Sequence, residues 1–237
     1  MSIDPMEIAG FNVEIIRKAI KNLHVGVYPP HGHVRVAAPL AVSDDAIRIA
    51  VLTRLSWIKR KRHAFEKQPR QSEREFVSGE THYVFGRQCR LRIEYWSGKR
   101  HEIDMQAADR LLLMAPEMSD TNQRRAFFEK WQREELRKIA APVITTWAKR
   151  LNLELPAWGI KRMKTKWGSC NPDAGRIWIN SELAKKPKIC TDYIVLHELA
   201  HFISPRHDDE FIAVLDTMMP TWRQVRSDLN ALPIAEM

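Results

Sequence analysis

Residues 197–201 read His-Glu-Leu-Ala-His, and this pentapeptide predicts both a local fold and a chemistry. An α-helix completes a turn in about 3.6 residues, so His197 and His201 lie one turn apart on the same face. Two imidazoles in this arrangement can bind one metal ion, and Glu198 lies beside the first of them, where it can act as a general base. The apolar residues 194–196 just before the pentapeptide predict a helix that is buried against a sheet.

A catalytic zinc ion usually has three protein ligands and one open position, so the two motif histidines need a third partner. His207 follows six residues later, and Pro205 disfavours helix at Ser204, which lets the chain turn back. The acidic residues 208–210 suit the first turn of a following helix, although each of these carboxylates is an alternative third ligand. We therefore expect one zinc ion per chain, bound by the two motif histidines and His207, with Glu198 as catalytic base.

Composition indicates a folded protein with a basic surface. The chain has 237 residues, 44% of them hydrophobic, and a formal net charge of +9. This charge is compatible with nucleic acid or an acidic partner, and residues 59–62 (Lys-Arg-Lys-Arg) are either a nucleic-acid contact or a solvated helix face. No run of about 18 apolar residues and no signal-peptide pattern occur, so we expect no membrane partner. The scattered Cys89, Cys170 and Cys190 fit free thiols in a cytoplasmic protein.

Strand-like and helical segments follow one another along the chain. A helix is expected over residues 44–67 and a long amphipathic helix over residues 121–151. Ser97-Gly98 predicts a hairpin between two neighbouring strands. We place a domain boundary near residues 116–120, which gives an amino-terminal strand-rich α+β region over residues 1–118 and a second domain over residues 119–237. The remaining expected segments are strands at 12–17, 23–28, 33–38, 81–85, 90–96, 100–105, 159–163, 166–170 and 176–180, and helices at 189–202 and 208–219.

Further motifs accompany the pentapeptide in a set order. They are Lys166-Trp167-Gly168-Ser169-Cys170, Arg176-Ile177-Trp178-Ile179-Asn180, Asp192-Tyr193-Ile194-Val195-Leu196, His207 with Phe211, and Met219-Pro220-Thr221-Trp222-Arg223. Together these motifs resemble the YgjP-like family of predicted metal-dependent hydrolases, zincins related to minigluzincins and SprT-like proteases. The amino-terminal part resembles the family less distinctively. One departure is Ile212, where the family often has an aromatic residue, and it affects packing, not metal binding.

This resemblance implies an α+β fold with a zincin-like catalytic domain, which consists of a backing helix, a small mixed sheet and a metal-binding helix. It also implies zinc binding by the three histidines named above, and Glu198 as the base of a metallopeptidase. The strand that carries Ile177, Trp178 and Asn180 is expected above the metal helix, where an extended peptide or protein substrate adds as a further strand.

Two other functions stay open at this point. A metal-dependent endoribonuclease is one, because one bacterial class has three histidines at the same spacing. That class lacks the Glu after the first histidine, so Glu198 favours peptide hydrolysis. A non-catalytic zinc-containing module that binds protein or nucleic acid is the other, but a structural zinc site has four protein ligands. The related SprT-like proteases act on proteins attached to DNA, which keeps nucleic-acid association through the basic surface as an expected alternative. Tyr193 and Arg206 are both candidates for stabilising an oxyanion.

Overall fold

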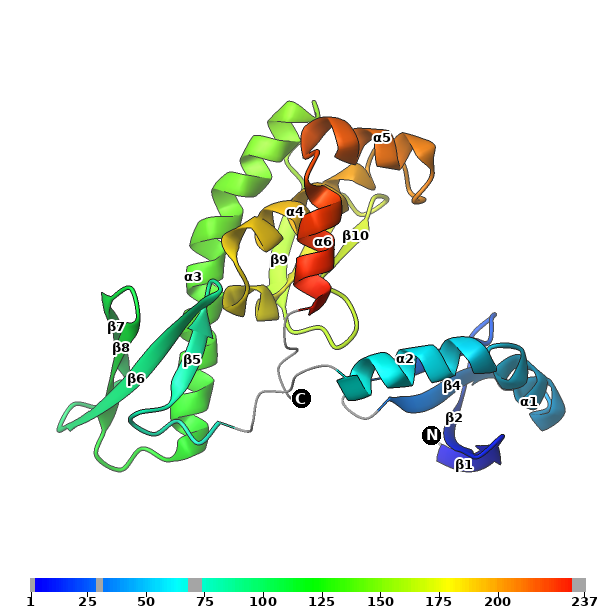
Figure 1. Cartoon of the computed structure of the whole chain (residues 1–237), viewed down its shortest axis with the longest axis horizontal. Helices are drawn as coiled ribbons and strands as arrows, with labels where there is room; N and C mark the ends of the chain where they lie inside the picture. The colour runs from blue at the N-terminus through cyan, green and yellow to red at the C-terminus, as the bar shows by residue number, and fades with distance from the viewer. Residues whose placement is uncertain (1–2, 29–31, 68–73, 232–237) are drawn as a thin grey trace. The chain divides into compact units, whose positions relative to one another are not determined.

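The computed structural model describes residues 3–28, 32–67 and 74–231, and the chain forms two compact units (Figure 1). One unit lies within residues 1–71 and the other within residues 72–232. The expected domain division lies later, after residue 118. The two compact units instead meet at residues 71 and 72. The sheet over residues 81–116 belongs to the second unit because it packs on the same long helix as the elements that carry the histidines.

The first unit is a four-stranded sheet with two helices. Its core consists of inward-facing aliphatic side chains such as Val13, Val36 and Ile47, which are fully buried. The helix expected over residues 44–67 is instead two helices, because the backbone N–H of Arg54 bonds to Val51 O and closes the first one. The sheet order is β1(Ile3–Ile8), β2(Phe11–Lys18), β4(His33–Pro39), β3(His24–Tyr28), with only β2 and β4 parallel, and the helices are α1(Asp44–Thr53) and α2(Leu55–Lys67).

The second unit begins with another four-stranded sheet, which packs on one end of the long helix α3(Thr121–Arg150). Phe128 of α3 meets Leu91, Leu111 and Leu113 of the sheet in one buried cluster. The hairpin expected at Ser97-Gly98 is wrong: the strand after this turn pairs with a later strand, which runs parallel to the strand before the turn. The order is β5(Thr81–Val84), β6(Arg87–Trp96), β8(Arg110–Pro116), β7(Glu102–Ala107).

A three-stranded mixed sheet and the remaining helices complete this unit. The strand order is β10(Gly168–Asn171), β11(Arg176–Asn180), β9(Ala157–Lys161), with β9 parallel and β10 antiparallel to the central β11. The helices that follow are η1(Ser181–Lys185), a 3₁₀ helix, and α4(Lys188–Ala200), α5(Asp209–Met218) and α6(Trp222–Ala231).

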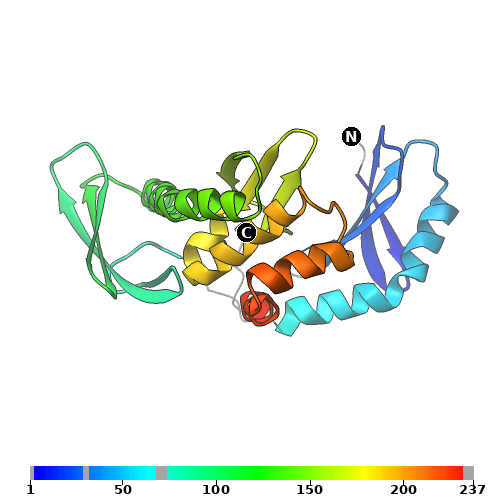
Figure 2. The same ribbon diagram turned by 90° about the horizontal axis from the view of Figure 1, so that it is seen from above.

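The long helix α3 is the backing helix for α4. It starts with a capping box at Asp120 and Gln123 and continues through Pro142 over 30 residues. It runs behind α4 in Figure 1 and beside it in Figure 2, and the indole Nε1 of Trp147 donates to Asp192 Oδ1 at 2.5 Å. The predicted α+β class, with a long backing helix and a small mixed sheet, is therefore confirmed. None of the helices in the described part of the chain has the length and apolar character needed to span a membrane.

Candidate metal centre

The helix α4 is buried on almost every side, and this fixes the direction of its two histidines. Ile194, Val195, Leu196 and Leu199 are 5% exposed or less and pack in the core of the second unit. His197 and His201 lie one turn apart, as their spacing predicts, with ring centroids 5.1 Å apart. The helix ends at Ala200, and His201 is its C-cap residue.

The loop between α4 and α5 brings His207 back to the helix. Ser204 is buried, and its hydroxyl donates to Asp208 Oδ1 at 2.8 Å. The same carboxylate oxygen accepts from the backbone N–H of Phe211 at 3.1 Å, so Asp208 is the N-cap of α5. This pair of hydrogen bonds fixes both ends of a short loop, and His207 lies within it. The acidic residue Asp208 therefore serves as a helix cap.

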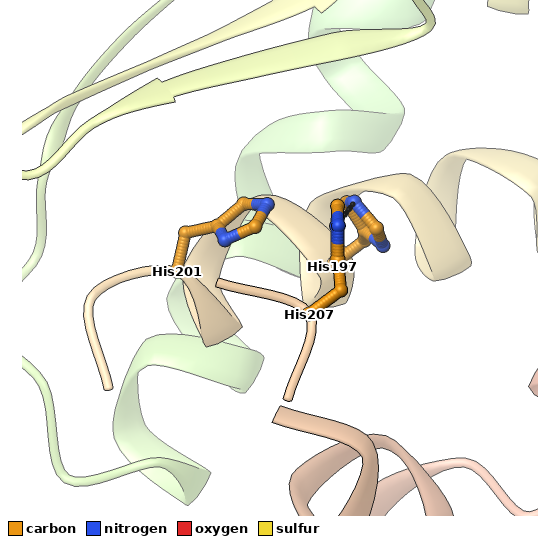
Figure 3. Close-up of side chains that lie close together, drawn as sticks. All are labelled: His197, His201 and His207. Atoms are coloured by element: carbon orange, nitrogen blue, oxygen red, sulfur yellow. Dashed lines mark hydrogen bonds between the residues drawn. The ribbon is translucent and has the colours of Figure 1, made fainter. Parts of the chain in front are cut away.

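The three histidine rings converge over the last turns of α4 (Figure 3). One nitrogen from each of His197, His201 and His207 lies within 4.8 Å of the others. The ring of Phe211 contacts all three, with centroid distances of 5.0, 4.8 and 4.6 Å. An aromatic ring packed against three imidazoles restricts their rotation, so Phe211 helps to orient the cluster. This role was not predicted from the sequence, although Phe211 belongs to the motif that accompanies His207.

The geometry and the charge state of these histidines fit a zinc ion. His197 Nε2 and His207 Nε2 are 3.2 Å apart. Two nitrogens that bind one tetrahedral zinc at about 2.0–2.1 Å lie about 3.3–3.4 Å from each other. Burial, and then the neighbouring histidines, lower the pKa of His197 to about 3, and burial also lowers the pKa of His201. Neutral imidazoles keep the lone pairs that a metal requires. His201 Nδ1 lies 3.2 Å from Ser204 O, an arrangement that favours the proton on Nδ1 and leaves Nε2 for the metal.

Glu198 follows His197 in the chain, and its side chain is buried. It is 5% exposed, and burial raises the pKa of its carboxyl to about 7. The ammonium of Lys166 and a hydrogen bond from the backbone N–H of Cys170 act in the opposite direction, since both stabilise the carboxylate. A carboxyl group with a pKa near neutrality can both accept and deliver a proton at physiological pH.

The strand named from the sequence as a substrate contact is the central strand of its sheet. Both edges of β11 are hydrogen-bonded, one to β10 and one to β9, so no further strand can add to it. The outer edge of β10, the strand next to Glu198, pairs with no strand in the described part of the chain. Ile177 is fully buried, and Trp178 is half-buried with Lys161 over its ring.

The side chain of Asn180 is hydrogen-bonded to the backbone of the loop between β9 and β10. It is 3% exposed, and its side-chain amide donates to Met163 O at 2.8 Å and to Lys166 O at 2.7 Å. Its Oδ1 accepts from the backbone N–H groups of Met163 and Glu182, both at 3.2 Å. The structure thus brings the three histidines together and places the Glu198 carboxyl against β10, while direct substrate contact by Ile177, Trp178 and Asn180 stays a prediction.

Tyr193 and the basic run over residues 59–62 were also singled out from the sequence. Tyr193 is buried, stacks on Trp222 at 6.3 Å and lies edge-on to His197 at 5.8 Å. In the first unit, the basic run on α2 is exposed at Lys59 to Lys61, and Arg62 lies over the ring of Phe11 at 4.9 Å.

Comparison with known proteins gives a family and several similar solved structures, including two metallopeptidase zymogens. The family model described as "YgjP-like, metallopeptidase domain" matches residues 22–232. The crystal structure of the metallopeptidase zymogen jannalysin from Methanocaldococcus jannaschii aligns at 23% identity and a TM-score of 0.36, over 38% of this chain and 86% of that one. The metallopeptidase zymogen abylysin from Pyrococcus abyssi aligns at 16% identity and a TM-score of 0.36, over 40% and 99% of the two chains. No curated protein matches the chain.

Proposed function

Since this chain belongs to the YgjP-like family of metallopeptidases, and is thus a metal-dependent peptidase that acts on peptides or proteins, we propose a specific site for its reaction. One zinc ion is held by His197, His201 and His207, and Glu198 is the general base. The observation that carries this proposal is the convergence of three imidazoles, with the buried carboxyl group of Glu198 next to His197 in the chain. No fourth histidine, cysteine or carboxylate joins the cluster among the described residues, which supports an open coordination position.

The reaction divides between the metal and the protein. His197, His201 and His207 would hold the zinc ion, which would supply an activated water and a Lewis acid for the carbonyl group. Glu198 takes a proton from the attacking water and later delivers it to the leaving amine. The backbone N–H of Cys170 holds the Glu198 carboxylate against β10 while it does so. The loop bonds of Ser204 and Asp208 keep His207 close to α4.

We place the substrate along the open edge of β10. An extended peptide that pairs with this edge bonds to backbone groups of β10 other than the N–H of Cys170, and it lies next to Glu198. Strand pairing recognises the peptide backbone, so it accepts many sequences, and charged side chains around the site add selectivity. This placement replaces pairing with β11, whose two edges are occupied.

We also propose the nucleic-acid association and the cytoplasmic location that the sequence predicts. The net charge of +9 favours an anionic partner, and the three cysteines are free thiols, as in a reducing compartment. The assay below includes RNA beside casein.

The test uses the full-length protein, Glu198→Gln and His207→Ala. Metal content is measured by mass spectrometry, and the degradation of casein and of RNA is followed in parallel. We expect the unchanged protein to contain about one zinc per chain and to digest casein but not RNA. Glu198→Gln should keep its metal and lose activity, and His207→Ala should lose both. RNA degradation that depends on Glu198, with casein intact, would establish the endoribonuclease instead.

A further inference from the structure

Glu198 fills the space that a side chain at residue 168 would need. A Cβ atom built on Gly168 would lie 2.5 Å from Glu198 Oε1, 2.7 Å from Cγ and 2.8 Å from Cδ. Real Cβ atoms essentially never come within 3.0 Å of another heavy atom. The backbone conformation of Gly168 is not one that requires glycine, because it lies in the ordinary strand region. The close approach of Glu198 is therefore the feature that requires glycine here.

The backbone of β10 is held in place on the side away from the open edge. Gly168 and Cys170 are in register with Ile179 and Ile177 of β11. Because side chains alternate along a strand, positions 168 and 170 share one face, and the N–H of Cys170 binds the Glu198 carboxylate. The residue before Gly168 is also fixed, since the N–H of Asn180 donates to Trp167 O at 2.9 Å. A clash at residue 168 is therefore relieved by movement of Glu198.

We propose that Gly168 is a positioning residue for proton transfer. Its missing side chain lets the Glu198 carboxylate lie against β10, where the N–H of Cys170 orients it beside the histidine cluster. The proposal rests on the proposed role of Glu198 as general base. It assigns a function in the reaction to the backbone of β10, in addition to its open edge.

The direct test is Gly168→Ala, with Gly98→Ala as the matched control. A Cβ on Gly98 would lie 2.4 Å from Trp96 Cζ2, a comparable clash in the turn between β6 and β7. We expect Gly168→Ala to lower kcat about 100-fold, the order expected for a misplacement of about 1 Å, with KM and zinc content close to unchanged. Gly98→Ala should keep kcat close to that of the unchanged protein.

A double-mutant cycle measures the same contact without activity. Glu198→Ala removes the three atoms that meet the new Cβ. We expect Gly168→Ala to lower Tm by about 3–10 °C when Glu198 is present, as for an overpacked site. In the Glu198→Ala background the same change should lower Tm by less than half as much. If Gly168→Ala alone does not fold, the double variant should still fold.

The outcomes separate this proposal from the proposed function. An active Glu198→Gln variant would refute the role of Glu198, and the positioning role of Gly168 with it. An inactive Glu198→Gln variant together with a fully active Gly168→Ala variant would refute the positioning role alone. Equal losses of Tm in the two backgrounds, or loss of zinc in Gly168→Ala, would also overturn it, because both indicate general damage.

Discussion

Replacement of Asn180 by alanine distinguishes a structural role from contact with substrate. Asn180 makes four hydrogen bonds from a nearly fully buried position, three of them to the loop between β9 and β10. Through Lys166 O this side chain holds the chain just before Gly168. Asn180→Ala therefore leaves the backbone groups at Met163, Lys166 and Glu182 without their partner.

The expected loss follows from the number of bonds. A typical intramolecular hydrogen bond contributes about 1 kcal/mol net, so four contribute about 4 kcal/mol. Part of the loop is exposed, and water replaces some of the lost bonds, which reduces the expected destabilisation to about 2–4 kcal/mol. For a domain of this size that corresponds to a Tm lower by about 5–15 °C. The matched control is Asn171→Ala, which removes a single exposed bond from the N–H of Ala174 and should cost about 1 kcal/mol or less.

Urea unfolding followed by tryptophan fluorescence measures the difference. All tryptophans except Trp57 lie within residues 72–232, so the signal reports mainly on the unit that contains Asn180. The reasoning is refuted if Asn180→Ala is no less stable than Asn171→Ala. A raised KM with unchanged stability would instead support the direct substrate contact predicted from the sequence.

Three further predictions concern pH, substrate charge and metal. Burial lowers the pKa of His82 to about 4 against the opposing effect of Glu80, so the folded state binds fewer protons than the unfolded state below pH 6.5. The free energy of unfolding, measured by urea titration, should therefore be highest above pH 6.5 and lower by roughly 1–2 kcal/mol at pH 5. His82→Gln should reduce this pH dependence, and an unchanged pH dependence in the variant would contradict the assignment. Lys166 is exposed, and its charge acts on both Glu198 and His201, so Lys166→Gln should lower kcat/KM about 3–10-fold for a peptide with Glu near the cleaved bond. The matched Gln peptide should change little, and equal losses for both peptides would exclude a charge effect. Chelation should abolish casein digestion and lower Tm, and added zinc should restore both, because a ligand that binds only the folded state stabilises it; casein digestion that survives chelation with the metal removed would argue against a metal-dependent reaction.

Helix α4 and its pair of histidines could be predicted because the residues that indicate them are close together in the sequence. The spacing of His197 and His201, the neighbouring Glu198 and the apolar residues before them all act within a few turns of one helix. His207 was within reach of the same reasoning, since Pro205 ends the preceding helical conformation and the acidic residues suit a new helix start. The family motifs added the α+β class, which the structure confirms.

Strand pairing was predicted less well because it depends on distant residues. The turn at Ser97-Gly98 favours a local hairpin, but β6 instead pairs in parallel with β8, which the sequence analysis did not identify as a strand. A parallel pair needs a connection that returns the chain to the same end, and here β7 lies within that connection. The residues of a turn do not determine which later strand pairs with the strand before the turn.

By itself, the sequence determined which side chains could bind a metal and activate water, because helical periodicity brings near neighbours to one face. Only the tertiary structure decided what surrounds them. It placed Phe211 against the three rings, the backbone of β10 against Glu198, and Asn180 on the loop before Gly168. Those contacts join segments far apart in the chain, and they form only when α4, β10 and β11 pack into one core.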